Sequence, residues 1–152
     1  MRPNFTNRGN NRPGNSGYNN ANVAPASTFD PNRFKDSWIT NEIDESFIEF
    51  AKEVGEELSN KGLTSSQIRN IYGEIKRIQV CGGYSGNKTS FLLLKPKVAY
   101  NTGRATSGVA GLSLFQKIFD KAWKSVSDDR TYKNFCDVME AILAYHRAKG
   151  GK

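Results

Sequence analysis

The side chains with the clearest capacity for chemistry in this sequence are basic, and they gather in one segment. Residues 61–104 contain eight lysine and arginine side chains but a single acidic one, Glu74, which gives this segment a net charge of +7. Lysine and arginine bind phosphate groups through charge and hydrogen bonds. The segment therefore predicts a surface that binds a polyanion.

The basic segment also places an aromatic side chain between two cations. Lys97, Tyr100 and Arg104 follow one another at intervals of three and four residues, so they project from roughly one face of a helix. Surfaces that follow an RNA backbone often have this composition. The same spacing also fits two long side chains that extend their charges into solvent around a half-buried tyrosine. The sequence leaves both interpretations open.

Acidic side chains are concentrated just before the basic segment. Residues 36–60 contain eight of them and one lysine, Lys52, which gives a net charge of −7. In a helix predicted over residues 41–60, five glutamates fall on one face, because residues three to four positions apart are neighbours there. This acidic stripe predicts contact with a basic partner. Its members are Glu42, Glu45, Glu49, Glu53 and Glu56.

Residue types that commonly perform catalysis or bind metals are sparse. His146 is the single histidine and lies beside the apolar positions of the last predicted helix, which indicates a structural role. Cys81 and Cys136 are too few for a disulfide framework and do not form a metal motif with His146. The glycine-rich residues 82–86 lack the lysine and the preceding strand of a phosphate-binding loop, so a turn is predicted. We expect no catalytic residue, metal site or cofactor.

The elements that position these side chains are predicted to be helices. After residue 36, apolar residues recur every three to four positions without a long stretch of alternation, which indicates an all-α domain. Thr64 and Gln67 have the spacing of a capping box, which marks the start of a helix. Helices are expected over residues 41–60, 65–80, from about 87, over about 112–126 and over 130–149.

The third predicted helix has two unusual features. It contains the run Phe91-Leu92-Leu93-Leu94, which is apolar around more than half of the helix, so the helix is expected to be central or to face a partner chain. Pro96 is expected to kink this helix or to start a new one, because proline removes a backbone donor and crowds the preceding turn. Residues 105–111 then predict a mobile connection.

Residues 1–36 are predicted to form a disordered tail that precedes a single domain at residues 37–152. The tail is rich in asparagine, glycine and proline, so it buries too little apolar surface to offset the entropy of ordering. Its arginines, with Phe5 and Tyr18, resemble a sparse RNA-binding arm, although a flexible extension is the simpler interpretation. Without a signal segment or a long apolar run, the chain is expected in the cytoplasm and away from membranes.

Three sequence blocks carry a resemblance to a known family. They are LTSSQIRNIY at residues 63–72, LKPKVAYNTGR at residues 94–104 and FCDVMEAILAYH at residues 135–146. Their order and spacing resemble the small helical subunit of type III-A CRISPR effector complexes, the Csm2-like subunits. The asparagine-rich tail departs from the pattern of that family.

The resemblance implies a compact bundle of about five helices, present in several copies that stack as an inner filament. It implies a subunit without a nuclease site, whose partners are guide RNA, target RNA, the backbone and large subunits and further copies of itself. The acidic stripe would then contact the next copy or a backbone subunit. Matching by position gives six basic candidates for contact with the RNA backbone: Arg69, Lys76, Arg77, Lys95, Lys97 and Arg104. The helical spacing adds Tyr100 to these candidates.

Two other functions also fit the sequence. One is a free-standing RNA-binding or chaperone-like module that uses the tail as its active arm. The other is a purely structural adaptor whose basic face binds acidic protein surfaces and never touches RNA.

Overall fold

The computed structural model describes residues 29–150, which form helices and connections without any strand. Three short elements are η1 (Pro31–Arg33), a 3-10 helix, α1 (Ser37–Thr40) and α4 (Gly83–Gly86). The prediction of an all-α bundle of about five helices is confirmed over the described range. The five long helices are α2 (Glu45–Asn60), α3 (Ser65–Val80), α5 (Lys88–Arg104), α6 (Val109–Trp123) and α7 (Asp129–Ala148).

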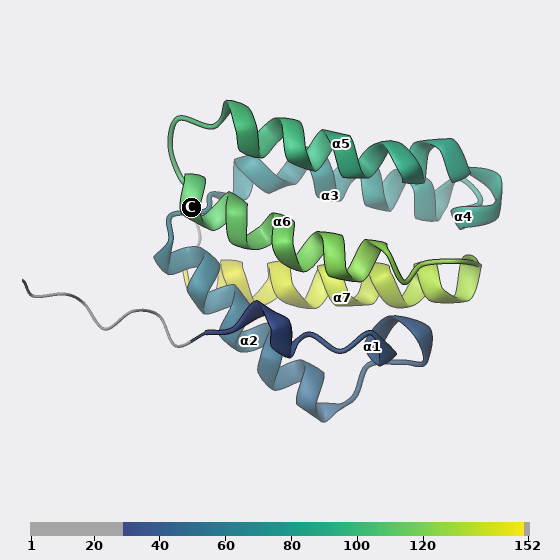
Figure 1. Ribbon diagram of the computed structural model, residues 1–152, viewed down its shortest axis with the longest axis horizontal. Coiled ribbons are helices and arrows are strands. Elements are labelled where there is room, and N and C mark those ends of the chain that lie inside the picture. The colour runs from purple at the N-terminus through teal and green to yellow at the C-terminus, as the bar shows by residue number, and fades with distance from the viewer. Residues whose placement is uncertain (1–28, 151–152) are drawn as a thin grey trace, which may run out of the picture.

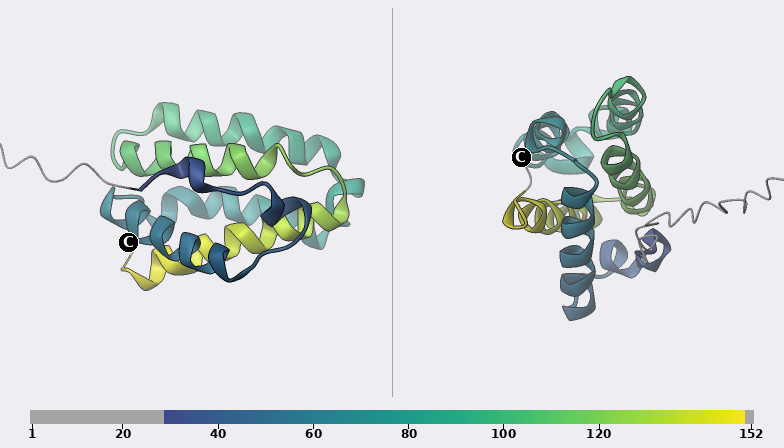
Figure 2. Two further views of the ribbon diagram at one scale, coloured as in Figure 1. Left: turned by 60° about the horizontal axis from the view of Figure 1, so that its bottom comes forward. Right: turned by 90° about the vertical axis from the view of Figure 1, so that its left-hand side faces the viewer.

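Four of the long helices run along the long axis of the molecule, and α2 crosses them at an angle (Figure 1). In this group α3 contacts α5, α5 contacts α6, α6 contacts α7 and α7 contacts α3. The end-on view in Figure 2 shows α3 and α5 side by side above α6 and α7. The most extensive contact in the bundle joins α2 to α7. As a result, α3 and α5 present their outer sides away from α2.

Aromatic rings fill the centre of the bundle. The Phe91 ring stacks on Trp123 at 5.4 Å between centroids and meets Tyr132 edge-on at 5.7 Å. The Tyr132 hydroxyl donates a hydrogen bond of 2.7 Å to the Ile75 carbonyl, so its polar end is satisfied inside the core. Burial raises the pKa of Tyr132. This cluster ties α5, α6 and α7 together and joins α3 through a backbone carbonyl.

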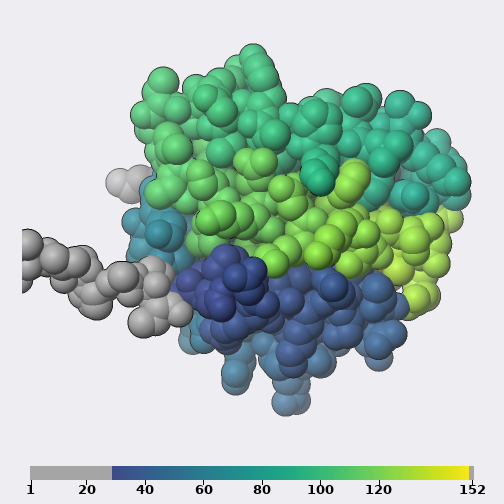
Figure 3. Space-filling model, viewed as in Figure 1, coloured from purple at the N-terminus to yellow at the C-terminus, as the bar shows by residue number. Residues whose placement is uncertain are grey.

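Residues 29–36, which the sequence assigned to the tail, pack on the bundle. Phe34 is only 8% exposed, and its ring lies 5.3 Å from Trp38 and 6.0 Å from Phe50 between centroids. The Arg33 guanidinium forms an ion pair with Glu53. Figure 3 shows these first described residues, in dark blue, against the surface of α6. The packed domain therefore includes residues before position 37, because a few apolar side chains anchor an otherwise polar segment.

The rest of the predicted tail, residues 1–28, lies outside the described residues. So do Phe5 and Tyr18, the aromatic side chains of the predicted RNA-binding arm.

The first predicted helix begins later than expected. α2 starts at Glu45, because the Asp44 carboxylate caps it by accepting hydrogen bonds from the Phe47 amide at 2.9 Å and from Trp38 Nε1 at 3.0 Å. Residues 37–40 form the separate helix α1, and Glu42 lies between the two helices. The prediction of one helix over residues 41–60 is therefore wrong in its first turn.

The second predicted helix is confirmed at both ends. α3 spans residues 65–80, and the capping box at its start is present. Gln67 Oε1 accepts from the Thr64 amide at 3.0 Å, and the Thr64 hydroxyl accepts from the Gln67 amide at 3.3 Å. Gln67 Nε2 also donates to the Ser107 carbonyl at 2.8 Å. The connection expected to be mobile is therefore held to α3, and α6 begins at Val109 rather than near residue 112.

The third predicted helix is a single helix, α5, with Pro96 inside it. It lies at the edge of the bundle, because Leu92 is 55% exposed and Leu93 is 49% exposed. The expectation of a central helix is therefore wrong, and the alternative of a partner-facing helix stays a prediction. The turn predicted at residues 82–86 is instead the short helix α4, where the Ser85 amide donates to Asp129 at 2.8 Å.

The corner between α2 and α3 is a meeting point of four helices. His146 of α7 is fully buried, and its Nε2 lies 2.6 Å from the Leu63 carbonyl. A Cβ added to Gly111 of α6 would lie 2.9 Å from the Leu63 amide nitrogen, so α6 approaches this corner at backbone distance. His146 thus has the structural role that its place beside an apolar stripe predicts.

Three aspartates at helix starts should make the fold sensitive to acid. The hydrogen bonds that their carboxylates accept lower the pKa of Asp44, Asp128 and Asp129. A folded-state pKa below the unfolded one stabilises the fold fully above the ordinary aspartate pKa of about 4 and loses this effect as the pH falls further. We expect the urea midpoint to drop below about pH 4.

The Asp128→Asn variant provides the check on this acid sensitivity. Asparagine keeps a capping oxygen but does not titrate, so the urea midpoint of the variant should depend less steeply on pH in the acid range. An identical dependence in both proteins would show that Asp128 does not contribute.

Candidate nucleic-acid interface

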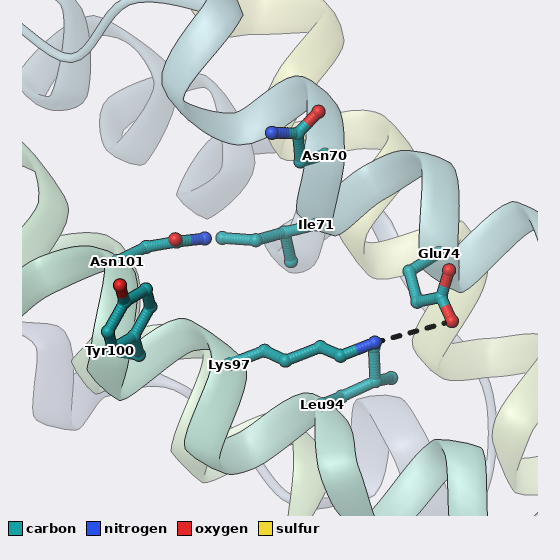
Figure 4. Close-up of a pocket in the computed structure, with 7 residues that line it drawn as sticks. All are labelled: Asn70, Ile71, Glu74, Leu94, Lys97, Tyr100 and Asn101. Atoms are coloured by element: carbon teal, nitrogen blue, oxygen red, sulfur yellow. Dashed lines mark ion pairs between the residues drawn. The ribbon is translucent and has the colours of Figure 1, made fainter.

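A groove runs between α3 and α5 on the outer side of the bundle. Its floor is apolar, because Ile71 of α3 and Leu94 of α5 are buried where the two helices meet. Its volume is about 310 Å³. Figure 4 shows side chains from both helices facing this space. The lining consists of Asn70, Ile71, Glu74, Leu94, Lys97, Tyr100 and Asn101.

Two cations meet one carboxylate at this groove. Glu74 accepts from Arg77 at 2.7 Å, and Lys97 Nζ lies 3.5 Å from Glu74 Oε1 across the groove. The hydrogen bond from Arg77, assisted by the charge of Lys97, lowers the pKa of Glu74. Glu74 is therefore ionised at neutral pH and holds both cations close to the groove.

Tyr100 and Arg104 continue this surface along α5. The guanidinium of Arg104 lies over the Tyr100 ring at 5.3 Å from its centroid. The Tyr100 side chain is nevertheless 65% exposed. The interpretation of a half-buried tyrosine between two extended cations is therefore wrong.

A second hollow of about 220 Å³ continues the groove toward the end of α5. Asn70 and Asn101 line both spaces, and Arg104 lines only the second. Ser66, Thr106 and Ser107 give this end a polar lining. The two hollows share Asn70 and Asn101 in their linings and together extend from Glu74 to Arg104, and we call the pair the α3–α5 channel.

Arg69 and Lys76 lie on the opposite flank of α3, toward α7. Lys76 Nζ is 3.7 Å from Glu140 of α7 and 5.7 Å from the centroid of the Tyr72 ring. Arg69 lines a separate groove of about 350 Å³ between α3 and α7. These two cations therefore belong to another surface than Lys97 and Arg104.

Lys95 lies on a third side, where α5 meets α6. Its ammonium lies 4.8 Å from the centroid of the Trp123 ring, and Trp123 Nε1 donates to the Phe91 carbonyl at 3.1 Å. This cation–π contact holds Lys95 against the bundle.

The structure thus divides the seven predicted RNA-contact residues into three groups. Lys97, Tyr100 and Arg104 line the α3–α5 groove, and Arg77 lies beside it through its ion pair with Glu74. The other three residues lie elsewhere. Sequence reasoning missed Asn70 and Asn101, the two amides that line both hollows. The signal was available, because Asn70 precedes Glu74 by four residues and Asn101 follows Lys97 by four, which is the spacing of helix-face neighbours.

Comparison with protein families decides the relationship that the three sequence blocks indicate. The model of the family Csm2 Type III-A matches residues 41–152, which include all five long helices. The chain belongs to the Csm2 family. This family provides the small subunit of type III-A CRISPR complexes, so the chain is a member of an effector complex with other subunits. No curated protein and no solved structure matches the chain.

The acidic stripe of this Csm2 family member is shorter than the sequence predicted. Glu42 precedes α2, and Glu53 is neutralised by Arg33. Glu45, Glu49 and Glu56 lie on α2 and form no ion pair within residues 29–150. Ile48, beside the first two of them, is 40% exposed. The remaining surface combines three unpaired carboxylates with one exposed apolar side chain.

The thiols and acidic groups of this Csm2 family member give no metal centre in the described part of the chain. Residues 29–150 contain no group of three histidine, cysteine, aspartate or glutamate side chains arranged to hold a metal ion. Cys81 is exposed, and burial raises the pKa of Cys136 to about 11. In the same range, no helix has the length and apolar character needed to cross a membrane.

Proposed function

We propose that this Csm2 family subunit is a non-catalytic RNA-contacting component of a cytoplasmic type III-A effector complex. Several copies stack as an inner filament, and each contacts the backbone of the guide and target RNA regardless of sequence. The observation that carries this proposal is the α3–α5 groove, with Arg77, Lys97 and Arg104 along one outer surface.

The chemistry of the groove favours the RNA backbone as its ligand. Phosphates are the same at every nucleotide, so contacts from lysine and arginine hold any guide and target equally well. An effector subunit that must accept every guide needs this independence from sequence. The two helices that line the groove, α3 and α5, lie on the side of the bundle away from α2 (Figure 1).

Charge segregation supports stacking of copies. Three carboxylates on α2 lack a partner within residues 29–150, while cations line the grooves beside α3. A chain with opposite charges on different sides favours head-to-tail association with another copy or with a basic subunit.

The test removes three groove cations from the subunit within the assembled complex. Arg77→Ala, Lys97→Ala and Arg104→Ala together should lower the slope of log affinity for target RNA against log salt by about two to three units. The physical reason is that binding releases fewer counterions from the RNA when fewer phosphates are neutralised by the protein. The measurement is a binding titration at several salt concentrations.

A matched control removes the same charge from another surface. Lys117→Ala and Lys121→Ala on α6, with Lys124→Ala directly after it, delete three lysines that do not line the α3–α5 groove. This variant should keep nearly the full salt slope. Equal slopes for both triple variants would remove the groove from the proposal. If the wild-type subunit does not crosslink to RNA in the complex, the subunit is a structural adaptor.

A second experiment separates assembly in a complex from an independent module. The tagged subunit purified from its host should bring other subunits and short RNAs that share a repeat-derived end. Recovery of the subunit alone with mixed cellular RNA would instead favour a free-standing RNA-binding module.

A further inference from the structure

Tyr100 is an exposed aromatic ring that the bundle does not use. It is 65% exposed, although large aromatic side chains stabilise a fold mainly by burial. Arg104 lies over its ring at 5.3 Å, which orients the ring but leaves most of it in solvent. An aromatic ring held in this way is a stacking surface for a flat, unsaturated ligand.

The charges around Tyr100 point to an anion at one end of the channel. At the other end, Glu74 pairs with both Arg77 and Lys97 and offsets one of their two positive charges. Arg104 has no carboxylate partner within residues 29–150, and the polar residues Ser66 and Thr106 line the hollow beside it. A phosphate group therefore fits best at the Arg104 end.

The middle of the channel has side-chain amides whose donors and acceptors are available to a ligand. The side chains of Asn70 and Asn101 form no hydrogen bond with other described residues, and they lie on opposite helices (Figure 4). Each amide has both a donor and an acceptor. They suit a ligand that carries donors and acceptors close to a flat ring, such as a sugar hydroxyl or the edge of a base.

From these three features we infer that the α3–α5 channel binds one unpaired RNA nucleotide. The base stacks on Tyr100, the phosphate lies at Arg104, and the amides of Asn70 and Asn101 bond the sugar hydroxyl or the base edge. This inference rests on the proposed contact with RNA and adds a specific subsite to it. A base inside a duplex already stacks on its neighbours, so the channel distinguishes unpaired from paired nucleotides.

The experiment uses the full-length protein and an RNA hairpin with a single bulged 2-aminopurine, whose fluorescence falls when the base stacks. A second hairpin carries the same 2-aminopurine within a paired stem. The bulged probe should lose fluorescence on saturation with protein, whereas the paired probe should change little. Titration of both probes also gives their affinities.

Variants of Tyr100 separate stacking from general attraction to RNA. Tyr100→Ala should bind the bulged hairpin about tenfold more weakly and leave its fluorescence high, with little change for the paired hairpin. Tyr100→Phe keeps the ring and should behave as the wild-type protein does. Because Tyr100 lies on the surface, neither change should impair folding, which circular dichroism checks.

The subsite is overturned if the isolated protein does not bind the bulged hairpin. It is also overturned if the bulged base keeps its fluorescence at saturation, or if Tyr100→Ala weakens both hairpins equally. None of these results affects the proposed function, which is judged by crosslinking to RNA and by the salt slope in the assembled complex. Failure of those measurements would remove the RNA contact as a whole.

Discussion

Replacing Gly55 with alanine should destabilise the protein by about 3 kcal/mol, the largest stability effect that we expect from adding one methyl group. A Cβ at this position would lie 2.6 Å from the amide nitrogen of His146 and 2.7 Å from the carbonyl carbon of Tyr145. Both are backbone atoms of α7, which a rotamer change cannot move. Relief requires that α2 and α7 separate, and this is the most extensive contact of the bundle.

The consequence reaches beyond the two helices. Moving α7 at residue 146 would disturb the contact between His146 Nε2 and the Leu63 carbonyl, on which the corner between α2 and α3 depends. Loss of this contact would leave a buried carbonyl without its partner. The measurement is equilibrium unfolding in urea, with the midpoint and slope of both proteins compared.

Gly73→Ala is the matched control, because it makes the same chemical change at a site with space. Apart from the adjoining residues and backbone of α3 itself, no atom lies within 4 Å of the Cβ that alanine would add to this exposed position. The variant should be about 1 kcal/mol more stable, since glycine is a poor helix former. Equal losses of stability in the two variants would contradict the packing argument for Gly55.

The features that were predictable from sequence are those with local causes. The α3 helix has its start fixed by Thr64 and Gln67, which are three residues apart, and its inward face by isoleucines at helical spacing. Both signals lie within the helix itself, and the helix was predicted to the residue. The first turn of α2 was misplaced, because Asp44 is bonded to Trp38 as well as to its own helix. The sequence shows an aspartate that can cap a helix, but it does not show that this cap makes α2 begin at Glu45 rather than near residue 41.

The arrangement of the candidate site could not be predicted, because it depends on helix packing. Arg69 and Arg77 are both basic residues of α3, yet one faces the groove toward α7 and the other pairs with Glu74 beside α5. Lys95 is held by Trp123, which is distant in sequence. Periodicity gives the direction of each side chain around its own helix, but not the neighbour that it meets. For the same reason the burial of Phe34 was missed.

The unpaired part of the acidic stripe is where a reversal of charge should have its largest effect on assembly. Glu45→Lys, Glu49→Lys and Glu56→Lys together should lower the amount of subunit recovered in the complex at least about tenfold, because like charges facing a basic partner cost several kcal/mol. These carboxylates have no ion pair within residues 29–150, so the change breaks no charge contact in the described fold. Exposed Ile48 beside them adds apolar contact to the same surface.

Two companion variants separate assembly from folding. Glu45 lies in the first turn of α2, where a cation opposes the helix dipole, so a second variant reverses only Glu49 and Glu56. A third variant changes Glu45, Glu49 and Glu56 to glutamine, which keeps their shape and removes their charge, and its loss of assembly should be intermediate. The measurement is the ratio of this subunit to the others in the purified complex, with circular dichroism of each variant. If the folded triple lysine variant enters the complex as fully as the wild type, α2 does not face a basic partner. The α3–α7 groove then becomes the next surface to examine, because its two arginines, Arg69 and Arg147, have no ion pair in the described range.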